Sequence, residues 1–363
     1  MHADRALIDT QSPLIRRAAR RVRLAAAGAA AALVLSACGT GTGSPAAPTT
    51  GGPAATTGGP AATTSAWKPT GPITIVVPFA AGGPTDTVTR QIGGPMGTAL
   101  GQTIVVSNVA GAGGTLAAGQ VAEAAADGYT VLMHHIGMST APSLYPNLEY
   151  DPLTSFKTIG LVTEVPMTIV GGTAFAPTTL AELVAHVKAN PGKVNYANAG
   201  VGAASHLCGL LIEKAIGADL VEVEYEGTGP AMDDLLGNQV DFMCDQTTNT
   251  TAHITAGKVK GYAITSPARN PALPDVPTTT EAGLPDVQVR VWHGLYVPAN
   301  TPDEVVQALT AALQTALLDA TVIAEFAKLG TVPVAADQAT PAAHTAKLQA
   351  EIEAWRPLLT GGG

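Results

Sequence analysis

From Ile73 onward the chain alternates short β-branched stretches with longer helical ones, and this order is the feature that most limits its fold. Strands separated by helices of this length usually form parallel β-α-β units. The sequence therefore predicts an α/β fold with doubly wound sheets. Its first five elements are expected to be a strand, a helix, a strand, a helix and a strand, at 73–77, 85–100, 103–108, 116–126 and 129–135.

A second series follows the same pattern. Near Thr179 the apolar residues recur at the spacing of an amphipathic helix, which Asn190-Pro191-Gly192 should end. Further strands are expected at 158–163, 167–171, 194–198, 220–225, 240–245 and 260–265. Further helices are expected at 205–215, 230–236, 302–318, 321–329 and 340–354.

The first 37 residues have the pattern of an export signal. Five arginines between Arg16 and Arg23 precede an apolar run at 24–35, which is too short to span a membrane as a helix. The run ends in Leu-Ser-Ala-Cys, which resembles the lipobox of bacterial lipoproteins. The sequence predicts a lipoprotein signal peptide at 1–37 and lipidation at Cys38; ordinary secretion with a chance cysteine is the alternative.

Composition changes sharply after the signal. Between Gly39 and Ala66 every residue is Gly, Thr, Ser, Pro or Ala, so we expect residues 38–68 to form a disordered tether behind the lipidated cysteine. Residues 1–37 hold six arginines and two aspartates of a chain with 19 basic and 28 acidic residues, so the mature chain has a net charge of −13. This charge argues against a nucleic-acid partner. An anionic ligand would have to be held by local donors.

Two glycine-rich loops follow predicted strands and precede predicted helices. They are VVPFAAGGPTD at 76–86 and YANAGVGAASHL at 196–207. Free backbone N–H groups and the helix dipole make such helix N-termini favourable for anions such as carboxylates. Neither loop contains an arginine, so a bound carboxylate would be held by the main chain and ordered water.

Catalytic and cofactor motifs are weak. Ser205 and His206 are adjacent at a helix start and point about 100° apart, so they are poor partners for nucleophilic catalysis. Ser139 lies in a sequence that lacks the last glycine of G-x-S-x-G. His134 and His135 face opposite ways on a strand and cannot chelate one metal together. The GAGG stretch at 111–114 does not complete a dinucleotide motif, and we expect no metal and no cofactor.

The chain contains three cysteines. If Cys38 carries lipid, Cys208 and Cys244 are left as an even pair in an oxidising compartment. A disulfide between them and two separate buried thiols remain about equally plausible.

Besides the two glycine loops, six further stretches between Ile73 and about Pro333 form an ordered set. They are NVAGAGG at 108–114, AADGYT at 125–130, ANPGKVNYAN at 189–198, GTGPAMDDLLGNQVDFMCD at 227–245, ALPDVPTTTEAGLP at 272–285 and WHGLYVP at 292–298. Together these motifs resemble the substrate-binding proteins of tripartite tricarboxylate transporters, the Bug type. Ala81 and Ala203 stand where that family often has Pro and Thr or Ser.

The resemblance implies a two-lobed periplasmic-binding-protein fold of type II, a Venus flytrap. Lobe one would comprise 69–170 plus 292–363, and lobe two 171–291. The protein would be a monomer that closes on a small carboxylate and delivers it to membrane permease subunits, itself held to the membrane only by lipid. Carried over by motif, the ligand-binding residues are Phe79, Ala80, Ala81, Gly82, Gly83, Pro84, Asp86, Gly137, Met138 and Ser139 in lobe one, and Asn198, Ala199, Gly200, Gly202, Ala203, Ser205, His206 and Asp245 in lobe two.

Two other functions remain open at this point. A sensor that reports ligand occupancy to a membrane signalling partner would share the same fold and pocket. An exported serine hydrolase using Ser205 or Ser139 is the less favoured alternative. The ligand itself is open among aliphatic and aromatic dicarboxylates, citrate-like acids and amides.

Overall fold

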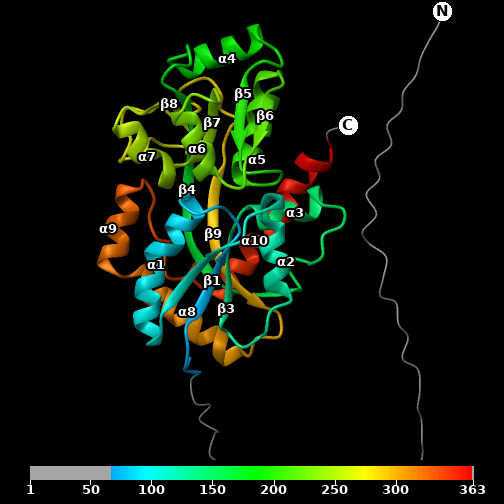
Figure 1. Cartoon of the computed structure of the whole chain (residues 1–363), viewed down its shortest axis with the longest axis vertical. Helices are drawn as coiled ribbons and strands as arrows, with labels where there is room; N and C mark the ends of the chain where they lie inside the picture. Colours follow the sequence, from blue (N-terminus) through cyan, green and yellow to red (C-terminus); the bar gives the residue numbers. More distant parts are fainter. Residues whose placement is uncertain (1–66, 362–363) are drawn as a thin grey trace, which may run out of the picture. The chain divides into compact units, whose positions relative to one another are not determined.

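The computed structural model describes residues 67–361 (Figure 1). The predicted signal peptide at 1–37, the lipidation site Cys38 and nearly all of the predicted tether lie outside the described residues. The strands are β1 Ile73–Val77, β2 Ile104–Asn108, β3 Thr130–His135, β4 Phe156–Gly172, β5 Asn195–Asn198, β6 Val221–Glu224, β7 Phe242–Gln246, β8 Val259–Ile264 and β9 Arg290–Pro298.

The helices follow the strands in α/β order, as the sequence pattern predicts. A single 3-10 turn, η1 at Ala112–Gly114, precedes the second helix. The helices are α1 Pro84–Leu100, α2 Thr115–Ala122, α3 Gly137–Leu144, α4 Leu180–Ala189, α5 Ala204–Ile216, α6 Thr228–Leu236, α7 Thr247–Thr255, α8 Asp303–Leu317, α9 Ala320–Lys328 and α10 Pro341–Thr360.

The strands form two sheets that share β4. The first sheet has the order β2-β1-β3-β9-β4, and the second has β4 between β8 and β7, followed by β5 and β6. The pairs β1-β2, β1-β3, β5-β6 and β5-β7 are parallel, whereas every pair that involves β4 or β9 is antiparallel. The parallel expectation therefore holds for β1, β2 and β3 and for β5, β6 and β7 among themselves, and it fails for every pair made by β4 or β9, including the outer strand β8.

Strand β4 corrects the prediction of two separate strands at 158–163 and 167–171. It is one strand of 17 residues, and its pairing changes at Pro166 and Met167. Up to Pro166 it pairs with β9, and from Met167 it pairs with β7. A proline suggests a break in a strand because it cannot donate to a ladder, but here Pro166 stands where the strand leaves one sheet for the other.

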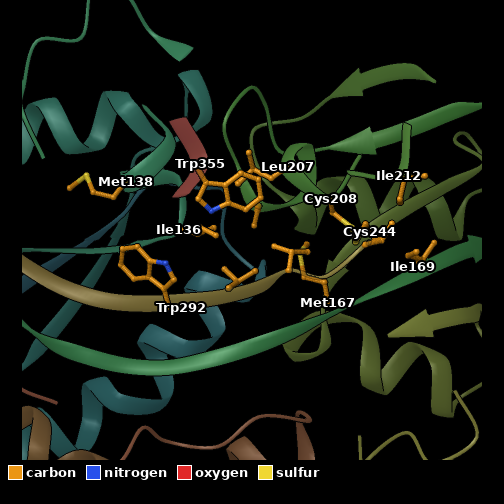
Figure 2. Close-up of a cluster of buried hydrophobic side chains, with 14 of the residues drawn as sticks. Ile136, Met138, Met167, Ile169, Leu207, Cys208, Ile212, Cys244, Trp292 and Trp355 are labelled. Atoms are coloured by element: carbon orange, nitrogen blue, oxygen red, sulfur yellow. A yellow bond between two sulfur atoms is a disulfide. The ribbon is translucent and has the colours of Figure 1, made fainter. Parts of the chain in front are cut away.

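Apolar clusters cover both faces of each sheet. In the first sheet, α1, α8 and α9 pack on one face, and α2, α3 and α10 contribute to the cluster on the other. In the second sheet, α4 and α5 pack on one face and α6 on the other. Figure 2 shows part of the largest cluster, in which Trp292 and Trp355 share an apolar region with Leu207 on α5. Both sheets therefore contribute to one continuous core.

Within residues 67–361, no single helix has the length and apolarity needed to cross a membrane. Helices α8 and α9 reach that length and apolarity only when they are taken together, and they are bent by 64° at the break between them.

Candidate ligand-binding site

The first glycine loop connects β1 to α1 and is held by Asp86. Gly82 has a φ of 81°, a left-handed conformation that favours glycine, and its N–H donates to Oδ2 of Asp86 at 3.0 Å. Arg90 donates to both carboxylate oxygens of Asp86 at 2.9 Å, and Asn108 donates to Oδ1 at 3.0 Å. Burial raises the pKa of Asp86, but these hydrogen bonds outweigh it and leave the pKa below its ordinary value. Asp86 thus fixes the loop and neutralises Arg90.

The second glycine loop connects β5 to α5 and is held by its own side chains. Gly200 and Gly202 have φ values of 91° and 81°. Oγ of Ser205 accepts from the N–H of Ala199 at 2.9 Å, and Nδ1 of His206 accepts from the N–H of Gly202 at 3.3 Å. Burial lowers the pKa of His206. Each side chain is engaged with the loop and not with the other, so the pair has no nucleophile-base geometry.

The two loops face one cavity. Hydrogen bonds join each loop to a neighbouring segment: the N–H of Ala80 donates to the carbonyl of Glu226 at 2.9 Å, and the side-chain Oγ1 of Thr140 donates to the carbonyl of Gly202 at 2.9 Å. The free volume of the cavity is about 20 Å³, which is room for about one water molecule. The lining residues are Phe79, Pro84, Thr85, His135, Ala199, Ala203, Ala204, Ser205, Thr228, Asp245 and Gln246.

Four helices begin at this cavity, and none of them has a side-chain cap. They are α1, α5, α6 and α7. In α1 the first intrahelical bond runs from the N–H of Thr87 to the carbonyl of Gly83, and in α5 from the N–H of Leu207 to the carbonyl of Ala203. The N–H groups that precede Thr87 and Leu207 are therefore not used by their own helices. The first turns of α1 and α5 present donors to the cavity from opposite sides.

The side chains that line the cavity include no lysine or arginine. His135 is buried, and burial holds its pKa well below the ordinary value, so its imidazole is neutral. Neighbouring His293 lies 3.3 Å from Oγ1 of Thr85, and burial lowers its pKa to about 3. Asp245 is the one acidic residue in the lining, and burial raises its pKa to about 6. Positive potential at the cavity therefore comes from helix dipoles and N–H groups.

A disulfide joins two elements that contribute residues to the cavity lining. It joins Cys208 on α5 to Cys244 on β7, and both residues are fully buried (Figure 2). Cys208 follows the first turn of α5, and Cys244 immediately precedes Asp245. The bond therefore links the helix that presents N–H groups to the strand that carries the buried carboxylate.

The structure places the expected ligand-binding residues in three groups. Phe79, Pro84, Ala199, Ala203, Ser205 and Asp245 line the cavity. Ala80, Ala81, Gly82, Gly83, Asp86, Asn198, Gly200, Gly202 and His206 shape or hold the two loops beside it. Gly137, Met138 and Ser139 begin α3 outside the lining.

The α3 residues have other surroundings. Met138 lies in the apolar core, and Oγ of Ser139 donates to the carbonyl of Ile136 at 2.6 Å. Because the Ser139 hydroxyl is buried and bonded within its own turn, it is not placed as a nucleophile. As ligand contacts, these residues and the other expected binding residues all stay predictions.

Five lining residues were not expected from the sequence: Thr85, His135, Ala204, Thr228 and Gln246. Thr228 could have been found by the pattern that identified the two glycine loops, a glycine between a strand and a helix. It opens α6 directly after Gly227 and follows β6. Gln246 follows Asp245 at the end of β7. His135 ends β3, and the parallel pairing of β3 with β1 places it beside the first glycine loop. The sequence does not show that pairing. Within residues 67–361 no group of three or more His, Cys, Asp or Glu is arranged to hold a metal.

Sequence comparison identifies the family. The profile described as "Tripartite tricarboxylate transporter family receptor" matches residues 88–360. The chain belongs to this receptor family. A family member encoded in the TAR-I ttuE-ttuC' intergenic region of Agrobacterium vitis is 51% identical over 295 residues, which cover 81% of this chain and 85% of that protein.

Solved structures of receptors agree with the fold. The periplasmic binding protein BugD is 50% identical and superimposes with a TM-score of 0.79, covering 81% of this chain and 98% of BugD. MatC from Rhodopseudomonas palustris, solved with bound malate, is 41% identical with a TM-score of 0.78, covering 80% of this chain and 99% of MatC. The protein is therefore a Bug-type extracytoplasmic solute receptor with the periplasmic-binding-protein fold, and its family is one of receptors and not of enzymes.

Proposed function

We propose that this receptor is a membrane-anchored lipoprotein that captures a small di- or tricarboxylate and delivers it to the permease subunits of a tripartite tricarboxylate transporter. The observation that carries the proposal is the pair of uncapped helix N-termini, α1 and α5, which face one cavity from different sheets. Malate bound to the similar receptor MatC supports a carboxylate as the ligand class.

The number of donors is adequate for such a ligand. A hydrogen bond to a charged group contributes about 1.5–3 kcal/mol. Binding in the micromolar range requires roughly 8 kcal/mol, so a few N–H donors from α1 and α5 with ordered water are sufficient. No lysine or arginine is needed.

The size of the cavity supports a lobe movement. A free volume of about 20 Å³ cannot admit a dicarboxylate, so ligand entry requires the two loops to separate. We propose that residues 69–170 plus 292–363 and residues 171–291 move as two lobes about the strands that connect the sheets. Because a ligand that contacts both loops binds only the closed form well, it shifts the population toward that form.

A thermal-shift screen of carboxylic acids against the protein lacking residues 1–66 tests the ligand class. A cognate acid at 100 times its Kd should stabilise the folded state by about 2.7 kcal/mol. The diamide of the same acid is the matched control, because it keeps the shape and removes the charge. A flat response to every acid would contradict carboxylate binding.

Two further measurements test the cellular role. Cys38→Ser should move the protein from the membrane fraction to the soluble fraction if Cys38 carries the lipid. Co-purification of the permease subunits with the ligand-loaded receptor would support transport. Recovery of a signalling protein in their place would favour the sensor alternative.

A further inference from the structure

Asp245 is a buried carboxylate in a cavity proposed for carboxylates. It lies at the end of β7, is 1% exposed, and lines the cavity beside Thr228 and Gln246. A second negative group of a ligand placed next to it would be repelled in this poorly hydrated environment. The position of Asp245 therefore restricts which acids the cavity accepts.

No cation compensates the charge of Asp245 among residues 67–361. The described ion pairs do not include it, and Arg90 is engaged with Asp86. Its Oδ2 accepts from Nδ2 of Asn249 at 2.7 Å. The neighbouring ring of His135 is neutral because burial lowers its pKa. The carboxylate is thus held by neutral donors and remains an acceptor toward the cavity.

The helix ends divide into two pairs around this residue. Asn249, in the first turn of α7, donates to Asp245. Thr228 opens α6 and Gln246 precedes α7, and both act to lower the pKa of Asp245. The N-termini of α6 and α7 therefore face the protein's own carboxylate. The first turn of α1 also carries a carboxylate, Asp86, but that carboxylate is paired with Arg90. The first turn of α5 has no acidic residue. The cavity has a donor side and an acceptor side.

We propose that Asp245 selects acids that carry a hydroxyl or ammonium donor next to a carboxylate, and discriminates against acids without that donor. The ligand carboxylate would bind the first turns of α1 and α5, and the adjacent donor would bind Asp245. This inference rests on the proposed function, because it defines the class of acid that the same cavity accepts. A buried polar atom without a hydrogen-bond partner, Oε1 of Gln246, adds a second acceptor on that side.

Ionisation of Asp245 agrees with this assignment. Burial raises its pKa to about 6, while the hydrogen bonds from Asn249, Gln246 and Thr228 lower it. At pH 7 the group is mostly ionised and accepts from a ligand donor. The histidine in the cavity lining, His135, stays neutral at that pH. Asp86 is ionised but is occupied by Arg90.

The experiment measures Kd by calorimetry at pH 7 for three acids with the same carbon chain: succinate, its 2-hydroxy derivative malate and its 2-amino derivative aspartate. The full-length exported protein is compared with Asp245→Asn, which keeps the shape and one acceptor oxygen but removes the charge. Asp233→Asn is the matched control, since Asp233 is exposed on α6 and does not line the cavity. Circular dichroism and thermal unfolding verify that both variants fold.

We expect the wild type to bind malate or aspartate at least about tenfold more tightly than succinate, and Asp245→Asn to reduce that ratio to about one. If Asp245→Asn binds aspartate about 100-fold more weakly than the wild type does, the ligand donor is an ammonium group. If it binds malate about tenfold more weakly, the ligand donor is a hydroxyl group. Asp233→Asn should leave the ratio unchanged.

Three results would overturn the inference. They are equal wild-type binding of all three acids, tighter binding of succinate, and an equal loss for all three acids in Asp245→Asn. Failure of the wild type to bind any of these acids, or any acid in the thermal-shift screen, would instead overturn the proposed function.

Discussion

Two groups of helices in this receptor begin in different ways. Helices α4, α9 and α10 start at the surface, and a side chain of Thr179, Asp319 or Thr340 accepts from their first-turn N–H groups. Helices α1 and α5 start at the cavity, where their N-cap residues, Gly83 and Ala203, have no side-chain hydrogen bond. A cap contributes about 1 kcal/mol. Helices α1 and α5 therefore lack the stability that a cap would contribute, and their first-turn N–H groups stay free to bind an anion.

The largest effect is expected from removing the disulfide that holds α5, a helix without an N-terminal side-chain cap. Replacing Cys208 and Cys244 together by Ala removes a bond that closes a loop of sequence separation 36. Loop entropy predicts a decrease of about 4 kcal/mol in the free energy of unfolding. Urea unfolding followed by circular dichroism measures it. A decrease below about 1 kcal/mol would mean that packing alone holds α5 on β7.

A second test gives α5 a cap of its own. Ala203→Asp places a carboxylate at the N-cap, where it would accept from the first-turn N–H groups and repel a ligand carboxylate. Because two charge-assisted hydrogen bonds are lost, acid affinity should fall at least about 100-fold, or about 2.7 kcal/mol. Calorimetry measures it, with Ala203→Ser as the uncharged control. Unchanged affinity in Ala203→Asp would refute the role of the α5 N-terminus.

A third test uses His344, which is buried in the second turn of capped helix α10. Burial lowers its pKa to about 3. Below pH 6.5 the unfolded chain takes up a proton that the folded chain does not, so the contribution of His344 to stability is present above pH 6.5 and is lost as pH falls. The expected slope is about 1.4 kcal/mol per pH unit, or roughly 2.5 kcal/mol between pH 6.5 and 4.5.

His344→Leu should remove that slope, as urea unfolding at pH 7, 5.5 and 4.5 would measure. The wild type should lose more stability on acidification than the variant does. Parallel pH profiles for the two proteins would contradict the assignment. Such a result would mean that His344 becomes protonated in the folded state.

The smallest effect is expected at a surface cap. Thr340→Ala removes the side chain that accepts from the N–H of Ala343 and should lower the free energy of unfolding by about 1 kcal/mol. Acid affinity should stay unchanged, because α10 does not begin at the cavity. Thermal unfolding and calorimetry on the same sample measure both. A loss of affinity comparable to that of Ala203→Asp would remove the distinction between the two groups of helices.

Local sequence signals predicted most of the fold. Short β-branched runs and amphipathic spacing located β1, α1, β2, β3, α5 and the C-terminal helices, since these signals depend on neighbouring residues only. Helix α7 was missed because its sequence, TTNTTAHIT, has low helix propensity and no apolar period. Its threonines Thr247, Thr248, Thr250 and Thr251 are buried, so packing stabilises a helix that propensity does not favour.

The candidate site, like the fold, has features that local sequence predicts and features that only packing decides. Glycines that permit left-handed turns at Gly82, Gly200 and Gly202 stand directly before helix starts, so the sequence by itself determined that two anion-favouring helix ends exist. Only the tertiary structure decided that they share one cavity and that Asp245 and neutral His135 line it with them. The physical reason is that strand order and the passage of β4 between two sheets depend on contacts between residues far apart in the chain. The local sequence pattern does not predict those contacts.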